Sequence, residues 1–596
     1  MVRSARHLYY AGTIAPGVTN VETVAHSVMV SYSPAVVYGA LLSAHEEGHM
    51  SYQLQPITPI PDETSRIARA VFPTGTLAMD VRDELADLYQ DQDFADLFAT
   101  RGQAAECPWR LAVVTILQFL EGLTDRQAAD AVRSRLDWKY LLGLELTDTG
   151  FHFTVLHAFR ARLIAGHAEL RLLTIMLERL QQAELLKARG RQRTDSTHVL
   201  AAVRTMNRLE IVGETLRFAL NRLAALAPDW LRAQITPDWF ARYSVRVENY
   251  RLPKADSERT ALAATIGSDG FHLLRAALDP QAPETVRTAP ALDILRRVWV
   301  QQFYGPEESV RWRAGGDVPP AERLIHSPYD IEARYSIKRG MPWLGYKVHL
   351  TETCDDDTPH LITQVATTPA TVQDDAVTAQ IQDELAARGL VPAIHLVDAG
   401  YTTAAHLVTS RDEHGIDLVG PVAASAGWQA RAGNGFDLDH FALDWDAQIA
   451  TCPQGNQSRP WEEGETPAGR QQFKVRFHAG DCRACACRED CTRRKTEPRA
   501  LTLLPRAEYE ALHAARLRQE TPAYKEVYAR RAGVEGTLAQ GIRVSDLRHS
   551  RYRGLARTHL QQIIIAVALN LLRTLAWLHD VPRAPTRISR FAALAV

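Results

Sequence analysis

The sequence lacks an uninterrupted apolar run of the length that crosses a bilayer. Its most apolar stretch, residues 563–578, is shorter than the roughly 20 residues required and contains Asn570 and Arg573. The first 30 residues carry Arg3 and Arg6 but are broken by Gly, Pro, Asn and Glu before an apolar run of signal-peptide length appears. We therefore expect a buried core helix at 563–578, no membrane partner and no secretion.

The sequence also lacks an excess of charge of either sign. Among 596 residues, 68 Lys and Arg stand against 70 Asp and Glu, so the formal net charge is -2. Any basic surface for a polyanion must therefore be local. With 46% apolar and 23% charged residues, the composition excludes a disordered chain, and the length allows about three or four domains.

Cysteine is scarce outside one short segment. Five of the seven cysteines lie between Cys452 and Cys491. An odd count without an export signal indicates a reducing compartment and favours metal or thiol roles over disulfides.

Composition and periodicity divide the chain into segments. Residues 1–75 show no sustained period and are expected to be an ill-ordered leader, with Met50 a possible true start. The pattern becomes helical over 76–190 and again over 200–325, while strand character appears within a segment 191–424. Residues 425–504 hold the cysteines, 505–580 return to long helices, and 581–596 form a tail.

A helix-turn-helix pattern occurs within the first helical segment. Residues 109–120 and 125–136 read as helices, Gly122 ends the first, and Thr124 with Gln127 forms a capping box for the second. A plain helical hairpin in a bundle fits these residues equally well.

The later segment has α/β character. Apolar runs at 344–350, 361–366 and 393–398 predict strands, 376–388 a helix, and 416–419 a further strand. A strand, helix, strand order implies an α/β unit with a parallel pair.

Three acids stand out by position. Asp195 lies in a polar, β-branched stretch, Asp398 ends a short apolar strand, and Glu535 shares a helix face with Tyr528 and Arg531. Ligands bind at the carboxyl ends of strands in open α/β sheets, and converging carboxylates suit a pair of Mg²⁺ ions. Ordinary solvated or capping acids remain the alternative.

Several blocks in fixed order carry a family resemblance. They are Arg193-Thr194-Asp195-Ser196-Thr197, residues 345–353 (GYKVHLTET), Val397-Asp398-Ala399-Gly400-Tyr401, Tyr528-x-x-Arg531-x-x-x-Glu535-Gly536-Thr537, residues 547–555 (LRHSRYRGL) and Asn570-Leu571. Together they cover roughly residues 80–580, and the chain resembles bacterial insertion-sequence transposases of the DDE class, in the branch with a cysteine-bearing insertion.

The resemblance implies an RNase H-like catalytic core, with a helical DNA-binding domain at 76–190, a helical insertion at 200–325 and a zinc-ribbon-like insertion at 425–504. It assigns Asp195 to the first strand, Asp398 to the fourth and Glu535 to a following helix, as ligands of two Mg²⁺ or Mn²⁺ ions. Tyr528 and Arg531 match residues that would hold DNA phosphates; helix packing and an Arg531–Glu535 pair are the alternative.

One position departs from the family pattern. A basic residue often follows the glutamate by seven positions, and here position 542 is Ile. Arg543 is adjacent but about 100° around the helix, which puts that phosphate contact in doubt.

A basic segment runs from Lys525 to Arg557 and suits phosphate neutralisation, with a solvated face as the alternative. The residues that we expect to bind DNA are Tyr528, Arg531, Arg543, Arg548, Arg551 and Arg553.

The cysteine spacing suits tetrahedral Zn²⁺. The resemblance favours Cys452, Cys482, Cys485 and Cys491 as ligands, with Cys487 as a spare. Unligated buried thiols, or a site lost in this copy, are the alternatives, and a bound zinc would have a structural role.

The resemblance implies a cytoplasmic, nucleoid-associated bacterial DNA transposase. It would bind the inverted-repeat ends of its element, cleave them and join the 3′-hydroxyl to target DNA, as a dimer or larger assembly on DNA. An RNase H-like nuclease without strand transfer and a decayed, non-catalytic DNA-binding protein are the alternatives.

Overall fold

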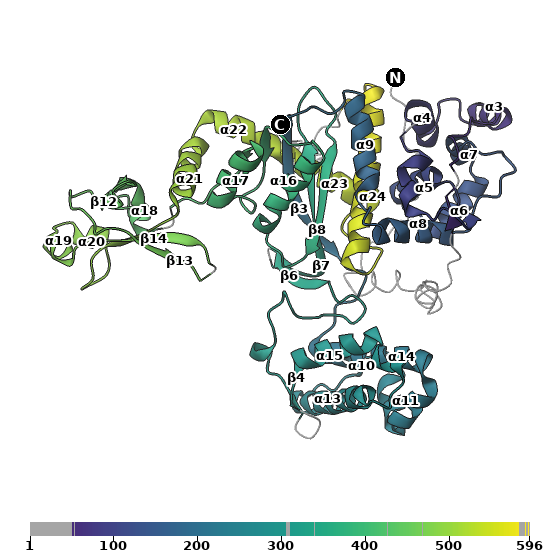
Figure 1. The fold of residues 1–596 in the computed structure, drawn as a ribbon, viewed down its shortest axis with the longest axis horizontal. Helices are drawn as coiled ribbons and strands as arrows, with labels where there is room; N and C mark the ends of the chain where they lie inside the picture. The colour runs from purple at the N-terminus through teal and green to yellow at the C-terminus, as the bar shows by residue number, and fades with distance from the viewer. Residues whose placement is uncertain are drawn as a thin grey trace. The chain divides into compact units, whose positions relative to one another are not determined.

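The computed structural model describes residues 50–52, 54–86, 88–305, 310–338, 340–425, 427–467 and 469–582, together with 591 and 594. Contacts divide these residues into two units. In the first, strands β1 (Met50–Ser51) and β2 (Gln103–Ala104) pair in parallel. The second holds the remaining strands and the helices (Figure 1).

The N-terminal part of the second unit is helical. Its helices are α3 (Asp62–Val71), α4 (Leu77–Glu84), α5 (Pro108–Leu120), α6 (Asp125–Ser134), α7 (Leu136–Leu142), α8 (Thr154–Ala165) and α9 (Arg171–Gln182). Helix α3 corrects the expected leader: Asp62 and Glu63 in its first turn and Arg69 in its last match the helix dipole, and Ala68 is buried. Residues 1–49 of that leader lie outside the described residues. Met50 as the true start therefore stays a prediction.

The turn between α5 and α6 has the predicted geometry. Gly122 adopts a left-handed conformation with φ +72°, and Thr124 and Gln127 form both hydrogen bonds of the capping box. Asp125, next to the cap, accepts a hydrogen bond from the buried Arg160 of α8 at 2.6 Å. The helix pair is thus confirmed as a local structure, and its use in DNA binding stays a prediction.

A six-stranded mixed sheet forms the centre of the second unit, in the order β10-β9-β3-β7, and confirms the α/β class. Its strands are β3 (Arg191–Leu200), β6 (Arg334–Lys338), β7 (Met341–Thr353), β8 (Ile362–Pro369), β9 (Ile394–Leu396) and β10 (Asp417–Val419). β3 pairs antiparallel with one edge of β7, and β6 and β8 pair with successive lengths of its other edge.

The predicted parallel pairing involves different partners from those implied by chain order. Helix α16 (Thr378–Ala387) connects β8 to β9, yet β9 pairs in parallel with β3 and β10. β8 instead pairs antiparallel with β7, its predecessor in the chain. Helix α17 (Ala404–His414) is the crossover between the parallel strands β9 and β10.

The segment between β3 and β6 is mostly helical, contains one short antiparallel pair of strands, β4 (Phe303–Tyr304) and β5 (Arg311–Trp312), and has its own core. Its helices are α10 (Arg208–Leu226), α11 (Pro228–Gln234), α12 (Pro237–Tyr243), α13 (Asp256–Leu278), α14 (Glu284–Arg287) and α15 (Pro290–Gln302). Trp299 is buried at their centre and donates to the Gly267 carbonyl at 2.9 Å.

The cysteine-rich segment is a small, mostly β module. It contains β11 (Ala442–Asp444), β12 (Ile449–Thr451), β13 (Glu462–Glu465), β14 (Gln471–Arg476), β15 (Ala500–Leu503), α18 (Trp428–Ala432), α19 (Ala479–Ala484) and α20 (Arg488–Cys491). Strands β13, β14 and β15 form one antiparallel sheet.

The chain then returns to helices α21 (Arg506–Gln519), α22 (Pro522–Ala529), α23 (Gly533–Ser545) and α24 (Leu555–Leu578). Within the described residues, α24 alone is long and apolar enough to cross a membrane, and 78% of that apolar window is buried inside the protein. It packs against β8, α5 and α9 (Figure 1). We therefore assign α24 to the core, as the sequence predicted. The tail is described only in part.

Candidate active site

The first two predicted acids lie at matching positions on neighbouring parallel strands. Arg193 of β3 pairs with Leu396 of β9, and two residues further along each strand direction are Asp195 and Asp398. Side chains two residues apart share a face of a sheet, and neighbouring strands are about 4.8 Å apart. The register therefore brings both aspartates to the same face at the carboxyl end of β9.

The third acid approaches from a helix on that face. Glu535 lies in the first turn of α23, and Arg531 lies four residues earlier, in the turn between α22 and α23. The Arg531 guanidinium donates to Asp195 Oδ2 at 2.6 Å, lies 3.4 Å from Glu535 Oε1 and lies 3.9 Å from Asp398 Oδ2. One guanidinium thus contacts all three predicted acids.

The three carboxylates differ in exposure. The side chains of Asp195, Asp398 and Glu535 are 12%, 37% and 67% exposed. Burial raises the pKa of Asp195, Arg531 and the Ser196 N–H oppose that rise, and Asp398 adds to it. Asp398 also accepts a hydrogen bond from the Gly400 N–H at 2.7 Å. Exposure of the three carboxylates therefore increases from Asp195 through Asp398 to Glu535.

The acids are not drawn together as tightly as bound ions would hold them. Within the described residues, one group of His, Cys, Asp or Glu has all its ligand atoms within 4.8 Å, and it is Asp383, Glu413 and His414. Asp383 and Glu413 are exposed, and this group joins the middle of α16 to the last turn of α17. At the predicted site, the Arg531 guanidinium lies among the three carboxylates.

Tyr528 contributes an aromatic wall beside the acids. Its ring stacks on Tyr524, with centroids 5.5 Å apart and an interplanar angle of 11°. Both tyrosines pack against a buried cluster of Cys354, Leu396 and Val419, the last two being the final residues of β9 and β10. Burial raises the pKa of Tyr528 to about 12, so the phenol stays protonated at neutral pH.

The predicted DNA-binding arginines from the end of α23 onward make different contacts. Arg548 donates to Thr197 Oγ1 at 2.9 Å, Arg551 donates to the Leu123 carbonyl at 2.8 Å and lies over the Phe119 ring, and Arg553 lies over the Tyr329 ring. Arg543 is exposed in the last turn of α23. Arg551 thus links the segment between α23 and α24 to the turn between α5 and α6. The basic pattern did not predict this contact within the protein.

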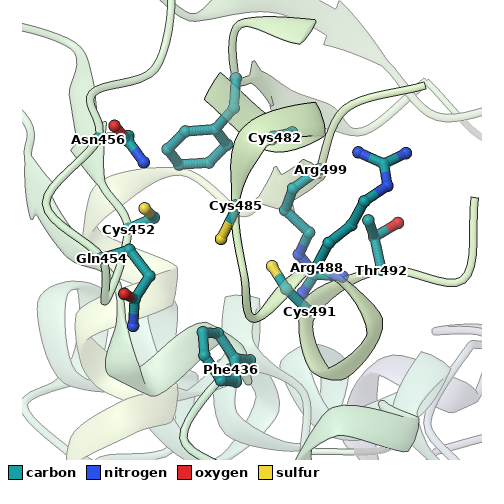
Figure 2. Close-up of a pocket in the computed structure, with 11 residues that line it drawn as sticks. Phe436, Cys452, Gln454, Asn456, Cys482, Cys485, Arg488, Cys491, Thr492 and Arg499 are labelled. Carbon is teal, nitrogen blue, oxygen red and sulfur yellow. The ribbon is translucent and has the colours of Figure 1, made fainter. Parts of the chain in front are cut away.

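The four predicted zinc ligands line one cavity of about 30 Å³. Figure 2 shows the sulfurs of Cys452, Cys485 and Cys491 around it. Cys482 is the fourth lining cysteine, and Cys487 is not among the lining residues. Cys487, which the predicted ligand set leaves out, is therefore also the one cysteine of the five in this segment that does not line the cavity.

Two arginines also line this cavity (Figure 2). Arg488 Nη1 and Arg499 Nε are buried and have no hydrogen-bond partner among the described residues. Burial raises the pKa of the Cys491 thiol to about 11, although Arg499 opposes that rise. Unpartnered cationic donors beside sulfur atoms indicate a cavity suited to negatively charged sulfur.

Some residues near the acids were not predicted from the sequence. Lys347 of β7 donates to Asp374 at 2.9 Å, and Asp374 accepts from Ser196, next to Asp195. Glu352 of β7 is fully buried between Arg193 and Arg573. A charged residue inside a strand whose neighbours are apolar or Thr is a visible signal for Glu352, but its partners are distant in sequence.

Comparison with known proteins gives two matches, both to transposase families. A family model described as "Transposase DDE domain" matches residues 451–575, which include Glu535 and the four lining cysteines but lie after Asp195 and Asp398. A second, described as "Transposase domain (DUF772)", matches residues 70–162, from the end of α3 into α8. No curated protein matches the chain.

Both matches are to transposases, as the sequence blocks also indicate. In the sequence, one match precedes and the other follows the strands of the central sheet. A DDE-class domain implies dependence on a divalent metal. Two separate segments of the chain therefore match transposase families, and both matches support an insertion-sequence DNA transposase of the DDE class.

Proposed function

We propose that Asp195, Asp398 and Glu535 hold two Mg²⁺ or Mn²⁺ ions that serve DNA cleavage and strand transfer. The observation that carries this proposal is the convergence of three acids, from β3, the end of β9 and α23, on the single guanidinium of Arg531. Hard divalent cations prefer carboxylate oxygens and keep positions for water or phosphate. The donor set therefore fits these ions.

The sheet order supports an RNase H-like core. Without β6, which pairs only with the first residues of β7, the strands in chain order are β3, β7, β8, β9 and β10, so Asp195 lies on the first and Asp398 two residues after the end of the fourth. Glu535 follows on a helix after the cysteine-rich module. These are the positions that the family resemblance assigns.

Both proposed reactions are in-line displacements at phosphorus. In the first, water attacks the phosphodiester at the element's end, and the bond to the 3′-oxygen breaks to leave a 3′-hydroxyl and a 5′-phosphate. In the second, that 3′-hydroxyl attacks a target phosphodiester and displaces the target's own 3′-oxygen. Bound divalent ions would supply activation of the attacking oxygen and stabilisation of the leaving oxygen.

The protein's own groups orient this chemistry. Asp195 is fixed by the Ser196 N–H and Asp398 by the Gly400 N–H, each at 2.7 Å, so both carboxylates are preorganised. The Tyr524–Tyr528 stack covers the adjoining ends of β9 and β10. We propose that Tyr528, Arg531 and the exposed Arg543 contact DNA next to the acids, with Arg548 and Arg553 at the edge of the same surface.

Arg531 has two roles in this proposal. Its contacts with the three acids neutralise part of their charge in the free protein. Its Nε is buried without a hydrogen-bond partner among the described groups, so one N–H donor of the guanidinium is left unbonded in the free protein. When the ions and DNA bind, we propose that Arg531 turns to a phosphate, which accepts paired hydrogen bonds from a guanidinium.

Replacing Arg531 with alanine is therefore expected to have opposite effects on two measurements. Mn²⁺ binding to the free protein should tighten roughly tenfold, a change of about 1.4 kcal/mol, because the competing cation is gone. Cleavage of end DNA should fall, because a phosphate contact is lost. Calorimetric titration with MnCl₂ in the absence of DNA gives the first value, with Arg530→Ala as control. Unchanged or weaker Mn²⁺ binding would contradict the first role.

The cysteine cavity fits a structural Zn²⁺. Four thiolates around one Zn²⁺ carry a net charge of -2, and Arg488 and Arg499 bring two positive groups with unpartnered N–H donors to the same cavity. Zn–S bonds of about 2.3 Å would require the sulfurs to move closer than they lie here. We propose that zinc bound by Cys452, Cys482, Cys485 and Cys491 braces this zinc-ribbon-like module.

The proposed partners are the inverted-repeat ends of the element and target DNA. The helical region that matches the transposase domain contains the α5–α6 pair, which we propose contacts end DNA. Because two ends must be joined, we propose a dimer or larger assembly on DNA, at the bacterial nucleoid in the cytoplasm.

The test uses purified protein, Mg²⁺ and the end duplex taken from DNA flanking the coding sequence. Metal-dependent nicking, cleavage and joining to a target plasmid are expected from wild-type protein. Cleavage without joining would indicate a nuclease, and binding without any metal-dependent product would indicate a non-catalytic DNA-binding protein.

A further inference from the structure

A buried carboxylate lies beneath the helix that carries Glu535, and the chemistry described above does not use it. The Glu352 side chain is 0% exposed. It accepts hydrogen bonds from Arg193 Nε at 2.7 Å, Arg573 Nη1 at 2.7 Å and Thr537 Oγ1 at 2.5 Å. These donors come from β3, α24 and α23, so one carboxylate joins three elements to β7.

The strand register places this cluster next to the acids. Arg193 pairs with Glu352 across β3 and β7, and Asp195 pairs with Leu350 two residues away. Arg193 and Asp195 therefore share a face of β3. The same face that presents Asp195 to the ions presents Arg193 and Glu352 to α23.

Helix α23 is held at its beginning as well as one turn later. Arg193 Nη1 donates to the Arg530 carbonyl. A Cβ added to Gly533 would lie 2.1 Å from Arg193 Nη1, so the helix backbone rests directly on this guanidinium. Thr537, one turn along, is bonded to Glu352. Glu535 lies between these two fixed points.

The fixed points are themselves braced by α24. Arg573 Nη2 donates to Thr537 Oγ1 at 2.6 Å and to Gln540 Oε1 at 3.0 Å. Burial alone would raise the pKa of Glu352, but Arg573, Arg193 and the Thr537 hydroxyl lower it below its ordinary value. The carboxylate stays charged, and its bonds are therefore charge-assisted and geometrically specific.

We propose that Glu352 is a positioning residue, which acts through Thr537 and Arg193 to set the rotation and depth of α23 so that Glu535 faces Asp195 and Asp398. This inference rests on the proposed role of Glu535 as a metal ligand. Glu535 is 67% exposed and cannot be oriented by its own packing. Its orientation comes from the buried side of its helix.

Thr537 is the residue through which positioning can be separated from folding. Thr537→Val removes the hydroxyl and keeps the shape, while Glu352 retains both arginines and Arg573 retains Gln540. Thr537→Ser keeps the hydroxyl. In Thr537→Val, the Mg²⁺ concentration for half-maximal end cleavage should rise about tenfold, and Mn²⁺ binding to the free protein should weaken similarly. Thr537→Ser should stay within about twofold of wild type for both.

A double-mutant comparison tests whether Thr537 acts through Glu535. Glu535→Gln should weaken Mn²⁺ binding, and adding Thr537→Val to it should cause little further loss. If Thr537→Val lowers thermal stability but leaves Mn²⁺ binding and the Mg²⁺ requirement unchanged, or if Thr537→Ser behaves like the valine variant, the positioning role is overturned.

The same experiment separates this inference from the proposed function. If Asp398→Asn abolishes Mn²⁺ binding while Thr537→Val behaves as wild type, the metal site stands and the positioning role of Glu352 is wrong. If Asp398→Asn and Glu535→Gln both bind Mn²⁺ as wild type does, the proposed metal site fails, and the positioning role fails with it.

Discussion

Asp398→Asn is expected to reduce the rate of end cleavage at least a thousandfold. Asparagine keeps the size of the side chain and can still accept the hydrogen bond from the Gly400 N–H, but it removes the negative charge that the metal ions require. Loss of about 4 kcal/mol of transition-state stabilisation corresponds to roughly three powers of ten. The measurement is the single-turnover rate on a labelled end duplex in Mg²⁺.

The matched control is Asp383→Asn. Asp383 is an exposed acid of α16 that lies with Glu413 and His414, apart from the proposed site. It should cleave at the wild-type rate. Equal activity of Asp398→Asn and wild type would remove Asp398 from the metal site, and a comparable loss in the control would point to a general defect instead.

Cys485→Ser is expected to abolish binding of one Zn²⁺ and to unfold the cysteine-rich module, residues 425–504. Among the module's described residues, the hydrophobic core cluster has seven buried apolar side chains, and domains with so small a core usually need a metal or disulfide to fold. Structural zinc sites contribute about 10 kcal/mol or more to folding. Zinc content should fall from about one per chain to near zero, with rapid proteolysis within 425–504.

Cys487→Ser is the control, because Cys487 does not line the cavity. This variant should retain zinc and protease resistance. Wild-type protein without zinc, purified without chelators, would contradict the site. Loss of zinc in the Cys487 variant alone would mean that the ligand set is wrong.

Much of the fold could be predicted because its signals are local. The capping box at Thr124 and the left-handed Gly122 fix the α5–α6 turn within a few residues, and the apolar runs mark β7, β8, β9 and β10. Strand partners are not local. β8 pairs with β7 and β9 with β3, and no spacing in the sequence encodes that choice.

In the candidate site, too, some residues could be predicted from the sequence and others, whose partners are distant in the sequence, could not. The order of sequence blocks selected Asp195, Asp398 and Glu535, which the structure brings to one guanidinium. The Glu352 cluster was missed because Arg193 and Arg573 are 159 and 221 residues from it in sequence. Likewise, the basic neighbours of Arg551 did not predict its hydrogen bond to the Leu123 carbonyl, 428 residues away in the sequence.

The central claim is that one metal site performs both cleavage and joining. The most direct measurement incubates a pre-cleaved end duplex, labelled at the 5′ end of the strand that carries the free 3′-hydroxyl, with a target plasmid and Mg²⁺, and quantifies covalent transfer of the label. We predict joined product from wild-type protein, none without a divalent metal, and none from Asp195→Asn, Asp398→Asn or Glu535→Gln. Joining that persists in all three variants, or wild-type cleavage that never yields joined product, would contradict the account.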